Sequence, residues 1–83
     1  MQEFEFIVEF SYNPKQETFV VRFLSGESYA LGLEQLPKKL LTKKPKWKDT
    51  VISSERNSLY IPAGKDEMKV IEAHIIHSKG KLL

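Results

Sequence analysis

The sequence contains no cysteine. That absence excludes disulfides and cysteine-ligated metals, which commonly reinforce small domains, and it fits a reducing compartment. With 83 residues, the chain has room for one core, and a domain of this size buries only about 60–65% of its unfolded surface. We therefore expect a single domain over residues 1–83, stable alone or through association with itself or a partner.

Long apolar runs are also missing. The wholly apolar stretches are only a few residues long, so we expect no membrane-spanning segment. Residues 1–5 alternate and carry two glutamates, without the basic start and apolar block of a secretory signal. The sequence predicts a cytoplasmic protein that does not bind membranes.

The common catalytic motifs are absent as well. The sequence has no cysteine nucleophile, no glycine-rich phosphate loop and no Gly-x-Ser-x-Gly elbow,. We predict that the chain is not an enzyme and uses no cofactor, because a chain this short spends most of its residues on a core. An enzyme would require a cleft in which Glu72, His74 and His77 converge.

Strict alternation marks residues 3–12. One face holds the apolar and aromatic residues Phe4, Phe6, Val8, Phe10 and Tyr12, and the other holds Glu3, Glu5, Ile7, Glu9 and Ser11. This pattern predicts a half-buried strand. Residues 13–16 supply turn chemistry, with Asn first and Pro second.

The run from Thr18 to Leu24 predicts a second strand. A reversal about Pro14-Lys15 sets Phe10 opposite Phe19, Val8 opposite Val21 and Phe6 opposite Phe23, with Arg22 near Glu5 and Glu9. A three-residue loop at 24–26, with Gly26 left-handed, then sets Val21 opposite Tyr29 and Phe19 opposite Leu31. The result is a three-stranded antiparallel meander that contains seven of the nine aromatic residues.

The rest of the chain must cover that meander. The spacing of Leu33, Leu36, Leu40 and Leu41 predicts a short helix at 36–43, with Pro37 in its first turn and Pro45 after its end. Residues 50–54 and 58–62 predict two short strands around a turn at 55–57. We expect a strand at 67–72 and a helical turn at 73–78 ended by Gly80, although helix and strand compete over 66–79. The predicted fold class is α+β.

Charge is concentrated in one segment. Residues 1–34 hold six acids and two bases, and residues 49–83 are balanced, whereas residues 35–48 hold six lysines and no acid,. The segment contains Lys38, Lys39, Lys43, Lys44, Lys46 and Lys48, with Trp47 among them. A basic loop with an aromatic side chain is able to bind phosphates and stack a base. The favoured interpretation is a solvated surface with Trp47 capping the core, since arginine, the better phosphate ligand, occurs only twice,.

Two further sets of residues are weaker candidates. His74 and His77 would share a face on a helix and oppose each other on a strand, and no third ligand stands near them, so we expect no metal site. Glu3, Glu5 and Glu9 would need raised pKa values in a cleft to act as acid and base. On the outer face of a strand they are solvated and deter aggregation.

Two stretches carry a resemblance to a known family. They are residues 23–29, which lead through Leu33 to a short helix near Leu36, and residues 57–62, followed by Ile75-Ile76-His77. They resemble a family of small bacterial proteins of unknown function with a "dGe-x-y" hairpin before a short helix and further strands. Tyr60 stands where that family usually has tryptophan. Some members are encoded beside toxin-like partners, so the resemblance implies a protein-binding or antitoxin-like role.

These observations together predict a small non-catalytic bacterial binding module that acts through protein–protein contacts, with a protein partner or a second copy of itself. The alternative is nucleic-acid or polyanion binding through the lysine-rich segment 38–48. The surfaces expected to bind a protein are that segment and the part of the meander that the helix leaves uncovered.

Overall fold

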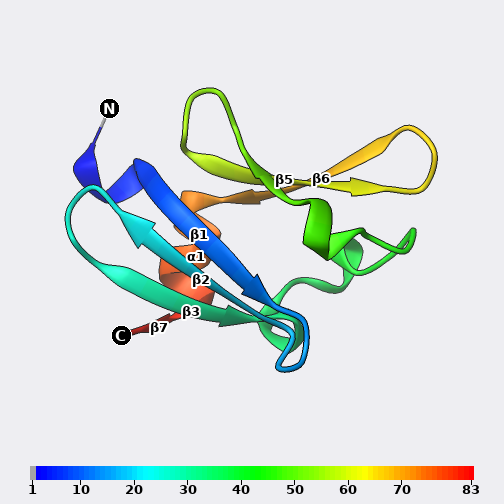
Figure 1. Ribbon diagram of the computed structural model, residues 1–83, viewed down its shortest axis with the longest axis horizontal. Coiled ribbons are helices and arrows are strands. Elements are labelled where there is room, and N and C mark those ends of the chain that lie inside the picture. The colour runs from blue at the N-terminus through cyan, green and yellow to red at the C-terminus, as the bar shows by residue number, and fades with distance from the viewer. Residues whose placement is uncertain (1) are drawn as a thin grey trace.

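Two antiparallel sheets pack against each other in the computed structural model, which describes residues 2–83 (Figure 1). One sheet has the order β1-β2-β3-β7, and the other has the order β4-β5-β6. The strands are β1 (Ile7–Asn13), β2 (Thr18–Phe23), β3 (Ser28–Gly32), β4 (Val51–Ile52), β5 (Ser58–Ala63), β6 (Glu67–Glu72) and β7 (Lys81–Leu82), and the one α-helix within residues 2–83 is α1 (Ala73–Lys79). The fold is α+β, as predicted.

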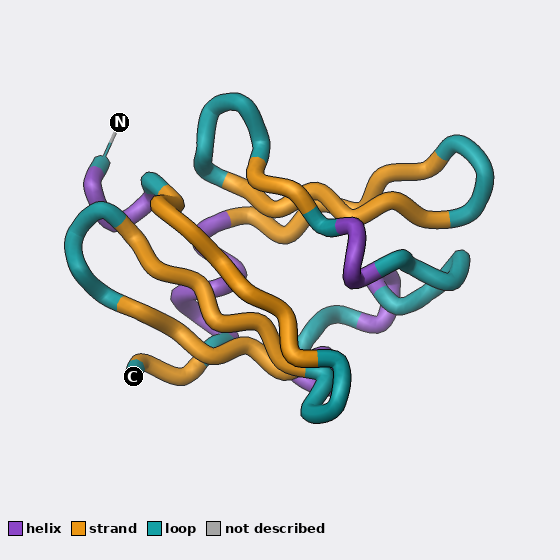
Figure 2. The backbone as a smooth tube through the Cα atoms, in the orientation of Figure 1, coloured by secondary structure: helices purple, strands orange, loops and turns teal. Residues whose placement is uncertain are grey.

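The core lies between the sheets. Its fully buried side chains come from both sheets and from α1: Ile7, Phe19, Val21, Phe23, Leu31, Leu59, Ile61, Ile71 and Ile76. The chain between β3 and β4 closes one end of the molecule with loops and short 3-10 turns (Figure 2). Helix α1 packs against β3 and β6.

The register between β2 and β3 confirms the prediction. Phe19 lies opposite Leu31, and Val21 lies opposite Tyr29. Gly26 has a φ of +97°, the left-handed conformation that glycine adopts without steric cost. The short loop and the apolar pattern therefore specify the same pairing.

The predicted register between β1 and β2 is wrong by two residues. Phe10 pairs with Val21, and Tyr12 pairs with Phe19. The cause is a longer loop at residues 14–17, because Asn13 is still a strand residue and pairs with Thr18. The Asn13 side-chain carbonyl accepts the N–H of Lys15 at 2.9 Å, so it stabilises the wider turn without forming part of a two-residue reversal.

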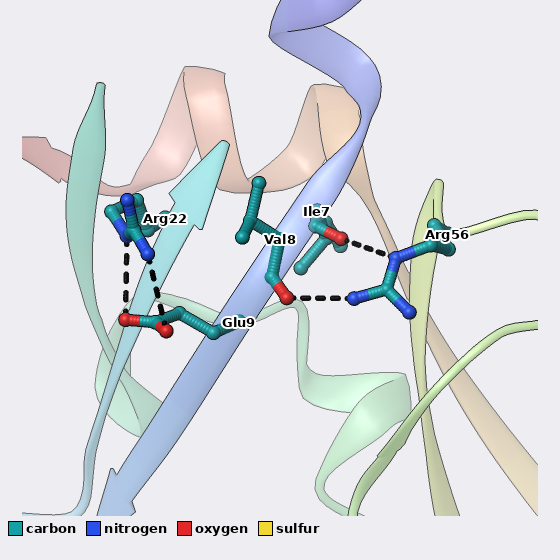
Figure 3. Close-up of polar contacts among 5 residues, drawn as sticks. All are labelled: Ile7, Val8, Glu9, Arg22 and Arg56. Carbon is teal, nitrogen blue, oxygen red and sulfur yellow. Dashed lines mark hydrogen bonds and ion pairs between the residues drawn. The ribbon is translucent and has the colours of Figure 1, made fainter. Parts of the chain in front are cut away.

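A β-bulge at Val8 overturns the predicted faces at the start of the first strand, whereas Phe10 and Tyr12 lie against the core as predicted. The register shifts between Ile7 and Glu9, and Ile7, expected beside the glutamates, is fully buried. The carbonyls of Ile7 and Val8 accept hydrogen bonds from Arg56 in the β4–β5 turn (Figure 3). The strand also begins later than expected, because Glu3–Glu5 form a 3-10 turn and Phe4 is exposed.

The predicted helix at 36–43 is also wrong. The structure has 3-10 turns at Leu33–Gln35 and Lys38–Leu40. Leu36 precedes Pro37 and takes an extended conformation with ψ of 150°, as residues before proline usually do. Leu33, Leu36 and Leu40 are buried as expected, whereas Leu41 is exposed.

The C-terminal part follows the predicted division into strand and helix. Strand β6 spans Glu67–Glu72, and α1 follows at once over Ala73–Lys79. The Gly80 N–H donates to the Ile76 carbonyl at 2.8 Å, which ends the helix. Strand β4 is shorter than the expected 50–54, and β7, which pairs with β3, was not predicted.

Candidate functional site

The lysine-rich segment lies at the end of the molecule away from the two termini (Figures 1 and 2). It runs from the 3-10 turn Lys38–Leu40 to the 3-10 turn Trp47–Asp49. All six of its lysines are exposed: Lys38, Lys39, Lys43, Lys44, Lys46 and Lys48. Their ammonium groups therefore face solvent, as the interpretation of a solvated surface requires.

Backbone and side-chain hydrogen bonds hold this segment against the β5–β6 hairpin. The Lys46 N–H donates to the Pro62 carbonyl at 2.8 Å, and the Gly64 N–H donates to the Lys43 carbonyl at 2.9 Å. Lys69 of β6 donates through Nζ to the Lys39 carbonyl at 3.0 Å. The segment is thus fixed to sheet β4-β5-β6 at three points.

Lys69 of β6 lies beside this segment, and its side chain is largely buried. Its side chain is 12% exposed, and its Nζ also lies 3.1 Å from a carboxylate oxygen of Glu67. A third hydrogen bond goes to the Thr42 hydroxyl at 3.1 Å. All three ammonium protons therefore have partners, which satisfies the charge that burial would otherwise penalise.

Three of the predicted site residues line a shallow hollow. Lys43, Lys44 and Lys46 surround it together with Gly64, and its volume is about 520 Å³. Lys43 and Lys44 have φ values of 66° and 49°, a left-handed conformation that costs non-glycine residues about 1 kcal/mol or more each. Among the described residues that line the hollow, none carries a carboxylate. Lys38, Lys39 and Lys48 lie outside it.

Trp47 belongs to the core and not to the hollow. Its ring packs edge-on against Phe19, with centroids 6.1 Å apart and planes at 72°. It is half-buried against the hydrophobic cluster. The expectation that Trp47 caps the core is confirmed.

A second concavity, of about 530 Å³, lies beside α1. Its lining comes from the first 3-10 turn, the start of β5 and α1: Phe4, Glu5, Asn57, Ser58, Glu72, Ala73, His74, His77 and Ser78. The groove does gather Glu72, His74 and His77. Their individual contacts decide what it can do.

The two histidines have different environments. His77 stacks on Phe23 with centroids 4.5 Å apart, meets the edge of Tyr29 at 4.6 Å, and bonds through Nε2 to the Phe4 carbonyl. His74 has a 70% exposed side chain, and its Nδ1 lies 3.4 Å from Glu72. His77 joins the first turn to α1, so the groove presents one solvent-exposed histidine–carboxylate pair. Within residues 2–83, no three histidine or acidic side chains are placed to hold a metal ion.

The predicted glutamate face is divided by the bulge. Glu9 pairs with Arg22 at 3.2 Å on the exposed surface of β1 and β2 (Figure 3). Glu3 and Glu5 lie in the 3-10 turn before the strand. The structure therefore confirms the proximity of Arg22 to Glu9 and gives the three glutamates no common surface.

Burial also perturbs the pKa of Tyr12, a residue of β1. Desolvation, and secondly the charge of Glu17, raise the pKa of the Tyr12 phenol. Tyr12 packs on Phe19, with ring centroids 4.7 Å apart. Its hydroxyl therefore stays neutral to a higher pH than that of a free tyrosine.

The outer face of sheet β4-β5-β6 is a surface that sequence reasoning missed. Val51, Tyr60 and Val70 form one row across the three strands. Their exposed fractions are 52%, 37% and 39%, and Met68, beside Val70 on β6, is 51% exposed. The signal was present in residues 58–62, where apolar residues fall on both faces of the strand. A half-buried strand would alternate apolar with polar residues.

Comparisons with protein-family models, with curated proteins and with solved structures find no match. Over residues 2–83, no helix is long and apolar enough to cross a lipid bilayer, and α1 has seven residues.

Proposed function

We propose that this chain is a small non-catalytic binding module that acts through protein–protein contacts. The observation that carries the proposal is the apolar row Val51, Tyr60 and Val70 on the outer face of β4-β5-β6. The outward face of an antiparallel sheet that contacts only water is normally polar. An apolar stripe there favours a surface that another protein covers.

Tyr60 is the central residue of that surface. It lies on the middle strand, between Val51 and Val70, and it is 37% exposed. Tyrosine is enriched among residues that dominate binding energies, because its ring buries a large area and its hydroxyl still finds a polar partner. The position and residue type make Tyr60 the side chain whose replacement should reduce binding most.

The test compares two lysine variants as baits for proteins retained from a lysate of cells that express the chain. Tyr60→Lys places a charge in the centre of the apolar row. Val20→Lys is the matched control, because Val20 is 38% exposed but lies on β2, in the other sheet. We expect Tyr60→Lys to lose a protein that the wild-type chain and Val20→Lys both retain. Equal retention by all three would contradict the proposed surface.

A second candidate function is nucleic-acid or polyanion binding through the lysine-rich segment 38–48. The observation that favours it is the hollow formed by Lys43, Lys44 and Lys46, on a loop held by hydrogen bonds to Pro62 and Gly64. Since Trp47 does not line this hollow, the contacts there would be to phosphates. Affinity would then be independent of base sequence and would fall with salt.

The test of this candidate measures binding to mixed duplex DNA and RNA over a range of salt concentrations. Simultaneous substitution of Lys43, Lys44 and Lys46 by glutamate should abolish retention at low salt. Glutamate at Lys15, Lys79 and Lys81, which are exposed elsewhere, changes the net charge equally and should leave most of the binding. Equal losses in the two triple variants would show a response to net charge alone and would refute the hollow as a site.

A further inference from the structure

Among residues 2–83, no strand pairs with the outer edge of β6. Strand β6 pairs with β5 on one side and is the last strand of its sheet. Free edges are templates for pairing with another chain, and proteins commonly protect them with proline, bulges or covering segments. At the first strand of the other sheet, a bulge and Arg56 provide such protection at Ile7 and Val8.

The hydrogen bonds of β5 identify which groups of β6 point to the free edge. The Ser58 and Pro62 carbonyls accept hydrogen bonds from the backbone N–H groups of Ser53 and Lys46. The backbone groups of the even-numbered residues of β5 therefore point away from β6. Odd-numbered residues of β5 pair with odd-numbered residues of β6. Because backbone groups alternate along a strand, Met68 and Val70 direct their N–H and C=O groups outward.

Two apolar side chains of β6 are exposed beside this edge. Met68 and Val70 are 51% and 39% exposed, and they continue the apolar row of the proposed binding surface. On the opposite face of the strand, Glu67 and Lys69 lie two residues apart and carry opposite charges, with 3.1 Å between Oε2 and Nζ. A strand with this charge pair is complementary to an antiparallel copy of itself.

We propose that the edge of β6 binds β6 of a second copy of this chain in antiparallel orientation, about a two-fold axis at Met68. This inference rests on the proposed function and names its partner. The outward groups of the even-numbered residues would form the hydrogen bonds between the copies. The product is one continuous six-stranded sheet, with the apolar rows of both copies on the same face.

The charges of β6 favour an axis at Met68 over an axis at Lys69 or at Val70. An axis at Met68 sets Glu67 opposite Lys69 of the second copy, twice. An axis at Lys69 would set Lys69 opposite itself and Asp66 opposite Glu72, and like charges directly opposite destabilise a strand pair. An axis at Val70 would set Lys69 opposite Ile71 and Met68 opposite Glu72, placing charged side chains against apolar ones.

The first experiment measures the molecular mass of the full chain by sedimentation equilibrium up to high micromolar concentration. We expect a concentration-dependent dimer. Met68→Lys brings two lysines together at the axis and should raise the dissociation constant at least about tenfold. Val70→Lys sets a lysine opposite Asp66 and should leave the dimer intact, and Val20→Lys, on a strand paired on both sides, is the control for an added charge.

The second experiment tests the register by charge exchange. Glu67→Lys and Lys69→Glu should each weaken self-association, because each places like charges opposite one another. An equimolar mixture should form a heterodimer, since the lysine introduced in the first variant then faces the glutamate introduced in the second. Circular dichroism of each variant checks that it is folded before mixing, which matters because Lys69 also bonds to Lys39.

A wild-type chain that stays monomeric at high micromolar concentration would overturn the inference, as would a dimer insensitive to Met68→Lys or disrupted by Val70→Lys. Failure of a heterodimer to form from folded variants would overturn the register. These outcomes are separable from the proposed function. A monomeric chain that still retains a protein through Tyr60 keeps the binding surface and loses only the second copy as its partner.

Discussion

Arg56 and Ile7 exchange two hydrogen bonds between the two halves of the chain. The Ile7 N–H donates to the Arg56 carbonyl at 2.7 Å, and the Arg56 Nε–H donates back to the Ile7 carbonyl at 2.9 Å. The guanidinium also donates to the Val8 carbonyl at 2.6 Å and lies 5.4 Å from the centre of the Phe6 ring. A single arginine therefore satisfies the backbone groups released by the bulge and joins the β4–β5 turn to β1.

Replacement of this arginine should destabilise the fold. Arg56→Ala removes two charge-assisted bonds and leaves the Ile7 and Val8 carbonyls without their donors, so we expect the free energy of unfolding to fall by about 2–3 kcal/mol. The matched control is Arg22→Ala, which breaks the exposed ion pair with Glu9 and should cost about 0–1 kcal/mol. Urea denaturation measures both. Equal losses would contradict the role assigned to Arg56.

The bulge places Ile7 in the core, so truncation there should be costly compared with truncation at an exposed strand position. Ile7 is fully buried, so Ile7→Ala should cost about 2–5 kcal/mol through lost burial and the cavity left behind. Val20→Ala, at a position 38% exposed, should cost less than about 1 kcal/mol. The comparison uses the midpoint and slope of chemical denaturation. A small loss of stability in Ile7→Ala would instead support the uninterrupted strand from residue 3 that the alternation predicted.

His77 should matter for the order of the first turn, and His74 should not. His77→Ala removes the stacking on Phe23 and the bond to the Phe4 carbonyl, a loss of about 2 kcal/mol. Amide hydrogen exchange at Glu5 and Phe6 should become faster, because their 3-10 bonds depend on a fixed turn. His74→Ala is the control, since its side chain is 70% exposed. Unchanged exchange in His77→Ala would refute the link.

Alkaline pH should destabilise the chain through Tyr12. Desolvation, followed by the charge of Glu17, raises the pKa of Tyr12 in the folded state, whereas the unfolded chain ionises near its ordinary value of about 10. The unfolded state therefore loses this proton first, and stability falls as pH rises from that value towards the folded pKa. Thermal unfolding of wild type and Tyr12→Phe between pH 8 and about 11 should diverge only at the alkaline end. Parallel curves would contradict the shift.

The parts of the fold that could be predicted are those specified by neighbouring residues. Gly26 fixes the β2–β3 loop, and the alternation of β2 and β3 then allows one register. The chain changes from strand to helix between Glu72 and Ala73, at the predicted position. Gly80 then ends the helix. In these segments, propensity and tertiary packing favour the same structure.

The parts that could not be predicted depend on distant residues. The bulge at Val8 is satisfied by Arg56, which is 49 residues from Ile7 in the sequence, so alternation alone favoured an uninterrupted strand. Between β3 and β4, leucine spacing suited a helix, but the extended conformation of Leu36 before Pro37 and the bond from Lys69 to Lys39 hold a 3-10 turn.

The candidate surfaces divide in the same way. Exposure of the six lysines followed from their charge, but the hollow needs Gly64 from a different turn. The outer row at Val51, Tyr60 and Val70 required the pairing of three strands. Sequence patterns could identify the residue types available for binding, and only the sheet topology shows which of them lie together.

The bond from His77 to the Phe4 carbonyl joins residues 73 positions apart in the sequence. During synthesis, the first turn therefore emerges from the ribosome long before the helix that fixes it. The hairpins of the meander can form early, but the bond that fixes Phe4 can form only when α1 is present. Contacts of such long sequence separation slow folding. We expect ordering around Phe4 to be a late event, coincident with the docking of α1.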